Sequence, residues 1–75
     1  MKNWRLIEML TVKERMETIL KTEFKVGEEF SSYIFIERSK PILKKFVQNQ
    51  RQVSFFLSRH PNVIKTTKKT WRRIA

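Results

Sequence analysis

The sequence has no cysteine, one glycine and one histidine among its 75 residues. Without cysteine the chain can form no disulfide bond, no thiolate zinc site and no cysteine nucleophile. The single histidine, His60, cannot build a typical zinc site alone; because Pro61 follows it, we expect it at a helix C-terminus, where its charged form suits the helix dipole. We therefore expect no metal and no cofactor, and a cytoplasmic or nucleoid-associated location in keeping with a reducing compartment.

Long apolar runs and catalytic motifs are missing as well. The longest apolar run covers only residues 33–36, whereas a membrane-spanning helix needs roughly 18 such residues. The N-terminus has a basic patch with no apolar stretch behind it, so we predict no signal peptide. Glu28 and Glu29 are adjacent and would point to opposite faces of a strand, which makes them a poor catalytic pair. With no nucleophile–base pattern and no glycine-rich phosphate loop, we expect a binding protein and not an enzyme, with no membrane contact and no evident small-molecule substrate.

Acidic residues are scarce in the second half of the chain. Residues 1–36 hold six basic and six acidic residues, whereas residues 37–75 hold eleven basic residues and one acidic residue, Glu37. The whole formal charge of +10 therefore lies in the second half. A basic surface polarised in this way is typical of a protein that binds a polyanion, and nucleic acid is the polyanion that we expect.

The rest of the composition indicates one small folded domain. Hydrophobic residues make up 40% of the chain and include six Phe and two Trp, which favours a packed core over disorder. A chain of this length buries only about 60% of the surface that its unfolded form exposes, which leaves little room for a second module or a deep catalytic cleft. We assign residues 11–75 to this domain and residues 1–10 to an N-terminal arm or helix extension.

Residues 11–24 have the pattern of an amphipathic helix. Thr11 and Glu14 are spaced as a capping box, in which each side chain accepts a hydrogen bond from the backbone N–H of the other. The apolar residues then recur on one helical face: Val12, Met16, Ile19, Leu20 and Phe24. Gly27, the only glycine, follows as a turn residue.

Two interpretations stay open for residues 28–39. In the first, Phe30 lies on a short strand, Ser31 or Ser32 caps a second helix, and that helix ends near Ser39 before Pro41. In the second, the aromatic and β-branched run forms one buried strand. Periodicity cannot separate the two in so short a run, but the serine pair before the apolar run favours the helix.

Residues 49–60 are predicted to form a third helix, with Asn49 as its cap and Pro61 after its end. Residues 40–48 then form a connection, because Pro41 disfavours a helix that runs through from Arg38. The apolar spacing also suits one continuous helix over residues 41–60, and this alternative stays open.

Residues 62–75 are predicted to form a β-hairpin. Two β-prone arms, 63–65 and 70–74, flank a polar and basic tip. Because the tip has no Asn-Gly or Asp-Gly pair, we expect a longer loop and not a tight turn. Strand alternation places Trp71 and Arg73 on one face and Arg72 on the other, and we expect Trp71 to be a core residue.

The order of helix, short strand, two helices and hairpin, together with the stretch from Gln50 to Val63, resembles the winged helix-turn-helix family of DNA-binding domains. The resemblance covers roughly residues 11–74, with residues 65–69 as the wing and Trp71 as the aromatic residue of the returning strand. It implies an α+β fold of three helices and a two- or three-stranded sheet. The chain departs from the family at Phe46-Val47-Gln48, where a small residue is usual, so this turn is longer or irregular, or the two helices are fused.

The helix over residues 49–59 has an outward face that suits the major groove of double-stranded DNA. Arg and Gln can form paired hydrogen bonds with guanine or adenine edges, and an exposed Phe can touch a thymine methyl group. With Val53, Phe56 and Leu57 turned to the core, the residues left on or near the outer face are Gln50, Arg51, Ser54, Phe55, Ser58 and Arg59.

The predicted wing, residues 65–73, suits phosphate oxygens or the edge of the minor groove. Its basic residues are Lys65, Lys68, Lys69, Arg72 and Arg73, and Lys44 and Lys45 are further candidates for a phosphate contact or are simply solvated.

We predict a small transcriptional regulator that binds specific double-stranded DNA sequences. Two half-sites bind more tightly than one, so a homodimer is expected to give useful affinity. The candidate dimer surface is the arm with Trp4, Leu6, Ile7 and Leu10, and the alternative that these residues only cover the core stays open. Two other classes stay open: a non-specific architectural or nucleoid protein, and a protein-interaction adaptor in a replication, transcription or ribosomal assembly. The choice between DNA and RNA is open as well.

Overall fold

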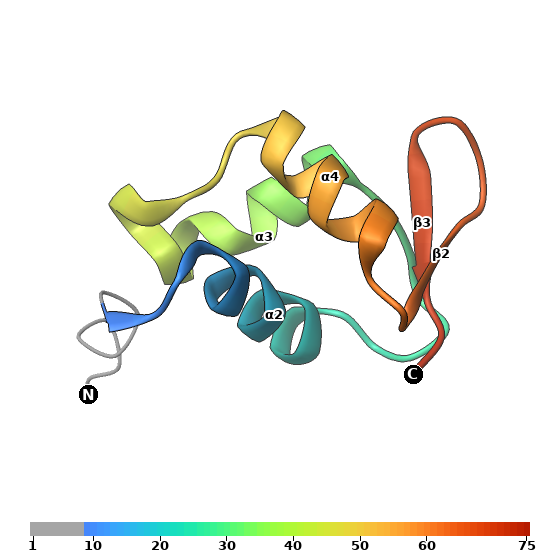
Figure 1. The fold of residues 1–75 in the computed structure, drawn as a ribbon, viewed down its shortest axis with the longest axis horizontal. Helices are drawn as coiled ribbons and strands as arrows, with labels where there is room; N and C mark the ends of the chain where they lie inside the picture. The colour runs from blue at the N-terminus through green and yellow to red at the C-terminus, as the bar shows by residue number, and fades with distance from the viewer. Residues whose placement is uncertain (1–8) are drawn as a thin grey trace.

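Within residues 9–75, which the computed structural model describes, three α-helices and a three-stranded antiparallel sheet surround one apolar core (Figure 1). The order along the chain is α2 (Val12–Glu23), β1 (Glu29–Ser31), α3 (Ser32–Leu43), the 3-10 helix η1 (Lys44–Phe46), α4 (Gln50–Arg59), β2 (Val63–Lys65) and β3 (Thr70–Arg73). This is the α+β winged-helix layout that the sequence predicts. Residues Trp4, Leu6 and Ile7 of the predicted dimer surface lie outside the described residues, and Leu10 packs at the edge of the core.

Local capping signals start α2 and α4 where the sequence predicts. The backbone N–H of Glu14 donates to Thr11 Oγ1 over 3.2 Å, and that of Thr11 donates to Glu14 Oε1 over 2.9 Å. Asn49 and Gln52 form the same reciprocal pair before α4, over 2.8 and 3.1 Å. Each box satisfies two N–H groups that a helix start would leave unpaired, so both helix starts are fixed by residues three positions apart.

The helical interpretation of residues 28–39 is confirmed, and the alternative of one buried strand is wrong. Phe30 lies on β1, and the side chain of Ser31 accepts a hydrogen bond of 3.2 Å from the backbone N–H of Ile34 as the cap of α3. Residues 32–43 then form a helix that turns Phe35, Ser39 and Leu43 into the interior.

The prediction that this helix ends before Pro41 is wrong. Pro41 lies inside α3, which continues to Leu43. Proline removes a helical hydrogen bond and costs about 3 kcal/mol or more in a helix interior. Here it lies in the last turn with its ring exposed, and continuing the helix buries Leu43 to 1% exposure. Full burial of a leucine side chain contributes about 1.5–3 kcal/mol, which offsets much of the cost.

The helix does not continue into α4, so the alternative of one helix over residues 41–60 is also wrong. Lys44 has φ +54°, a backbone conformation that side chains rarely adopt, and its N–H bonds to the Lys40 carbonyl. The chain then passes through η1 and the extended residues 47–49 to the Asn49 cap. The departure from the usual compact turn is confirmed in the form of a longer, irregular connection.

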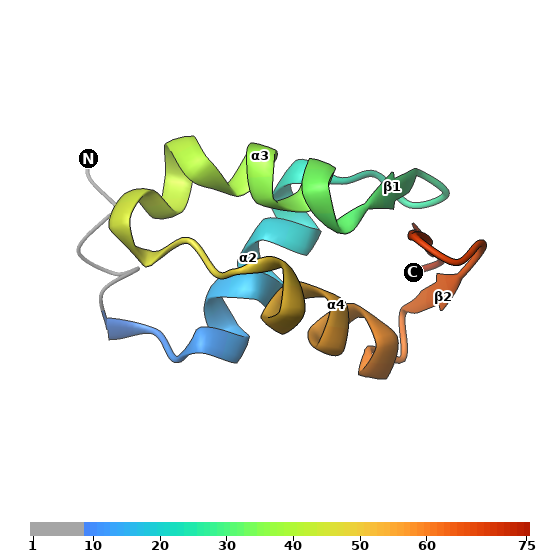
Figure 2. The same ribbon diagram turned by 90° about the horizontal axis from the view of Figure 1, so that it is seen from above.

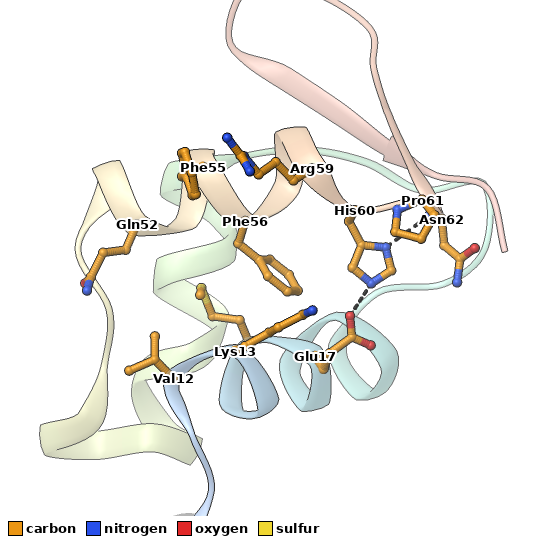
Figure 3. Close-up of a pocket in the computed structure, with 11 residues that line it drawn as sticks. Val12, Lys13, Glu17, Gln52, Phe55, Phe56, Arg59, His60, Pro61 and Asn62 are labelled. Carbon is orange, nitrogen blue, oxygen red and sulfur yellow. Dashed lines mark hydrogen bonds and ion pairs between the residues drawn. The ribbon is translucent and has the colours of Figure 1, made fainter.

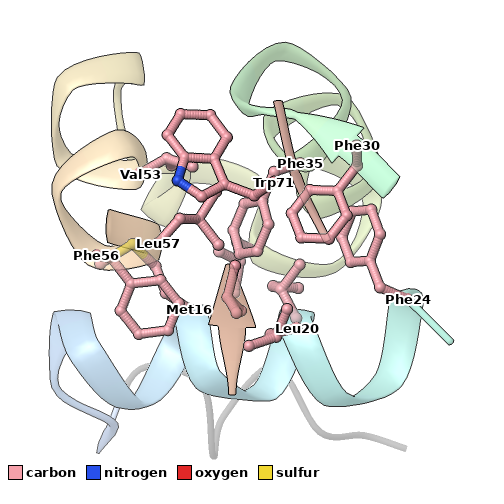
Figure 4. Packing of buried hydrophobic residues seen from close by; sticks show 12 residues of the cluster. Met16, Leu20, Phe24, Phe30, Phe35, Val53, Phe56, Leu57 and Trp71 are labelled. Atoms are coloured by element: carbon pink, nitrogen blue, oxygen red, sulfur yellow. The ribbon is translucent and has the colours of Figure 1, made fainter. Parts of the chain in front are cut away.

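The hairpin is confirmed, and β1 joins it to make the sheet. The strand order is β1-β3-β2, and Phe30 on β1 and Lys65 on β2 both stand opposite Trp71 on β3. Trp71 is 3% exposed and is therefore a core residue, as predicted. Figure 4 shows it beside Phe35 from α3 and Val53 and Leu57 from α4. The core thus fixes the sheet against α4 and sets where the hairpin projects.

Candidate nucleic-acid interface

Helix α4 is divided sharply into a buried and an exposed side. Val53, Phe56 and Leu57 are 1%, 8% and 0% exposed, which orients the helix firmly on the core. The predicted site residues of this helix lie away from that side: Gln50, Arg51, Phe55, Ser58 and Arg59 are exposed, and Ser54 is half-buried. Seen from above in Figure 2, α4 lies in the half of the molecule nearer the sheet, and α3 runs along the opposite side.

Two arginines on the exposed side of α4, Arg51 and Arg59, have no carboxylate partner among the described residues. Within residues 9–75 neither Arg51 nor Arg59 forms an ion pair, because the acidic side chains lie on other elements. No residue after Glu37 is acidic. Arg59 lies over the ring of Phe55, with its guanidinium carbon 4.2 Å from the ring centre. Both guanidinium groups therefore keep their hydrogen-bond donors for an outside partner.

The hairpin tip is organised by its threonines. The hydroxyl of Thr70 lies 2.7 Å from that of Thr66 and 2.6 Å from that of Thr67, and the Thr66 N–H donates to the Thr70 carbonyl over 3.0 Å. Thr66 and Thr70 also donate to a carboxylate oxygen of Glu29. These hydrogen bonds hold the pKa of Glu29 below its ordinary value. The threonines thus shape the loop, which leaves the lysines as its outward-facing donors.

The predicted basic residues of the hairpin divide into two groups. Lys65, Lys68 and Lys69 are exposed and make no ion pair within the described part of the chain, although Lys65 Nζ lies 5.4 Å from the Trp71 ring. Arg72 is paired with Glu29 over 3.3 Å. Arg73 donates to the carbonyls of Phe24 and Ala75 over 2.6 and 2.8 Å, so it ties β3 to the end of α2. The two arginines point to opposite faces, as strand alternation predicts.

Lys44 and Lys45 lie apart from the hairpin. Both are exposed on η1, and Lys45 Nζ is 5.4 Å from the ring centre of Phe46. Figure 1 shows η1 at the end of the molecule opposite to β2 and β3, with α4 between them. The structure therefore places the predicted basic residues along the length of α4 and at both of its ends, and not in one cluster.

One basic residue outside the predicted site has a clear structural role. Arg38 forms an ion pair of 2.7 Å with Glu28, donates to the Glu23 carbonyl over 2.8 Å and lies over the Phe24 ring. It therefore joins α3 to the end of α2. The backbone N–H of Lys25 and the Arg38 guanidinium, opposed by partial burial, hold the pKa of Glu28 below its ordinary value.

The other feature near α4 is a hydrogen-bonded group that sequence reasoning missed. His60, the residue that ends α4, bonds through Nε2 to the Glu17 carboxylate on α2, and its Nδ1 accepts from the backbone N–H of Asn62 over 3.0 Å. Because Nδ1 is an acceptor, the ring is in the tautomer with its proton on Nε2. Glu17 also forms an ion pair with Lys21, one helical turn further along α2, over 3.7 Å. The sequence gives little indication of this contact, because Glu17 and His60 are 43 positions apart.

Comparison with protein-family models, curated proteins and solved structures finds no match for this chain. Within residues 9–75 no group of three His, Asp or Glu side chains lies close enough to hold a metal ion. Nor is any helix of this part long and apolar enough to cross a membrane.

Proposed function

We propose that this protein binds double-stranded DNA, with α4 in the major groove and the β2–β3 hairpin on the phosphate backbone or the minor groove. The observation that carries the proposal is the pairing of charges. Within the described residues, the carboxylates of Glu28, Glu29 and Glu37 are paired with Arg38, Arg72 and Lys40, away from the outer side of α4. Unpaired cations are left along α4 and the hairpin tip, and a surface of one sign attracts the polyanion.

The shape of α4 supports a major-groove position. Its 10 residues span about 15 Å, and an α-helix fits the groove, which is about 12 Å wide. Arg51, Phe55 and Ser58 lie on the side opposite to the buried Val53 and Leu57, so they would face the base edges. Lys68 and Lys69 at the tip would contact phosphates, which position the protein without reading sequence.

The role that we propose is sequence-specific regulation and not catalysis. Arginine can bond guanine O6 and N7 together, and that geometry distinguishes one base pair from the others. A protein with this outer face therefore has the means to select a site. The choice between a regulator and an architectural protein depends on whether a preferred sequence exists.

The decisive experiment is selection from random duplexes, followed by fluorescence anisotropy with the selected duplex and a scrambled one at two salt concentrations. We expect a preferred site, and a log–log salt slope of about −0.9 for each phosphate neutralised. With contacts from five lysines, 44, 45, 65, 68 and 69, the slope would be about −4 to −5. Equal affinity for every duplex would favour the architectural class. A slope near zero would exclude nucleic acid as the partner and favour the adaptor class.

A further inference from the structure

A groove of about 760 Å³ lies between α2 and α4, beside the proposed DNA-binding side (Figure 3). Val12, Met16 and Phe56 provide apolar walls, and Phe55 stands at its rim. Val12 and Phe55 are 41% and 60% exposed, so much apolar surface remains uncovered here. Small-molecule sites have volumes of about 300–1,000 Å³ and are mostly apolar with a few placed polar groups. The groove matches both properties.

Two cations without carboxylate partners stand on its two walls. Lys13 on α2 extends along the groove, and Arg59 lines its α4 side with the guanidinium over the Phe55 ring at the outer edge (Figure 3). Neither forms an ion pair within residues 9–75. The one carboxylate of the groove, Glu17, is already bonded to His60 and lies 3.7 Å from Lys21. The field in the groove is therefore positive, and it favours an anion with an apolar body.

The shape of the groove favours a small molecule over a protein segment. The hydrogen bonds that join Glu17, His60 and Asn62 lie at one end of it, with Pro61 beside them (Figure 3). A second copy of this chain would bring another formal charge of +10 against a basic rim, which like-charge repulsion disfavours.

We propose that this groove binds a small organic anion with an aromatic or branched apolar body, such as an aromatic carboxylate. The apolar body contacts Met16, Phe55 and Phe56, and the anionic group pairs with Lys13 inside the groove or with Arg59 at its outer edge. This site does not depend on the proposed function. Its regulatory consequence does: an anion that engages Arg59 withdraws this side chain from DNA, so ligand and DNA oppose each other's binding.

The test is an NMR titration of the full chain with 2-naphthoate. We expect shifts confined to the Val12 and Met16 methyl groups, the Phe55 ring and the Arg59 side chain. Lys13→Gln and Arg59→Gln should each weaken binding about twofold to fivefold, the range for an exposed ion pair. Lys25→Gln removes one charge outside the groove and should leave binding unchanged. The neutral 2-naphthalenemethanol should bind the wild type and both groove variants equally.

Shifts that are absent or scattered over the surface would overturn the site. So would contacts in the spectra between the groove methyl groups and residues 1–8, since the chain itself would then occupy the groove. An equal effect of Lys13→Gln and Lys25→Gln would overturn the role of the cations. The regulatory part is tested by adding 2-naphthoate to the complex with the selected duplex: unchanged DNA affinity overturns it and leaves the site intact. If no duplex binds at all, the proposed function fails, and the titration still decides the site.

Discussion

The guanidinium of Arg59 lies 4.2 Å from the centre of the Phe55 ring, on the exposed side of α4. These residues are four positions apart, so they are neighbours on one helical face. Stacking holds the guanidinium plane before any partner arrives, and less conformational freedom is then lost on binding. Phe55 is 60% exposed, so the pair presents apolar surface and hydrogen-bond donors side by side.

Phe55 is expected to contact a thymine methyl group in the selected DNA site. Replacing the relevant thymine by uracil removes one methyl group and should weaken binding roughly fourfold, the equivalent of about 0.8 kcal/mol. Phe55→Ala should lower affinity for the thymine site and abolish this difference, whereas Phe55→Leu should keep part of it. Anisotropy titrations with paired duplexes measure both effects. Equal affinity of the wild type for every thymine and uracil pair would contradict the contact.

Arg51 is expected to read a guanine. It follows Gln50 at the start of α4, where groove-facing residues approach the base edges. Arg51→Ala should cost about 1–3 kcal/mol on the selected site and far less on a scrambled duplex. Arg51→Lys keeps the charge but loses the paired hydrogen-bond geometry. Its affinity for the selected site should therefore lie between that of the wild type and that of Arg51→Ala. If the alanine variant loses the same affinity for both duplexes, Arg51 is only a phosphate contact.

Lys68 and Lys69 are expected to position the protein without reading sequence. The double variant Lys68→Ala with Lys69→Ala should weaken binding to all duplexes alike and make the salt slope shallower by about 1.8. The matched control is Lys21→Ala with Lys25→Ala, which removes the same charge near the end of α2. A similar loss in the control would show that net charge alone matters. A changed sequence preference would assign base contacts to the tip.

Features that depend on residues close together in the sequence could be predicted, and features that depend on distant residues could not. The caps of α2 and α4 join residues three positions apart, such as Asn49 and Gln52, and both were predicted. Pro41 was misjudged because local preference opposes the helix, while its support comes from burial of Leu43 in the core. A tertiary contact of this kind has no local signature.

The candidate site shows the same limit. The exposed side of α4 follows from helical periodicity, so Arg51 and Phe55 were placed correctly on the surface. The internal partners of Arg72 and Arg73 are Glu29 and the Phe24 carbonyl, which are 43 and 49 residues away. The groove also needs two helices to be placed side by side. Sequence pattern therefore predicts which residues are outward, but not which of them are already engaged.

Lys44→Gly is expected to stabilise the protein. The φ of +54° at Lys44 suits glycine, and a residue held in such a region costs of order 1–3 kcal/mol. Part of this strain relief is offset because glycine has more conformational freedom in the unfolded chain. We therefore expect the free energy of unfolding to rise by about 1 kcal/mol, which corresponds to roughly 4–8 °C in Tm. The control Lys45→Gly, at a neighbour without a positive φ, should destabilise slightly. Thermal unfolding measures both, and an equal response of the two variants would refute the strain.

Ionised Glu28 is expected to stabilise the fold, so that the free energy of unfolding falls when the carboxylate is protonated in acid. Its pKa is lowered in the folded protein from an ordinary value of 4.5. The stabilisation is therefore complete above that value and is lost as the pH falls through the folded pKa. Glu28→Gln should lower the free energy of unfolding at pH 7 and reduce the difference between pH 7 and pH 3, measured by urea unfolding. Glu23→Gln, at a carboxylate with no ion pair in the described residues, should leave that difference unchanged.

The strand order β1-β3-β2 has a consequence for how the chain acquires its shape. The middle strand is the one synthesised last, so β1 and β2 have no strand between them while the ribosome is still adding residues 70–73. The helices can collapse early because their caps are local, but the core lacks Trp71 until synthesis reaches this strand. The core is therefore completed only when β3 is present, and a chain truncated after residue 69 would keep the lysines of the tip but lose the strand that joins β1 to β2.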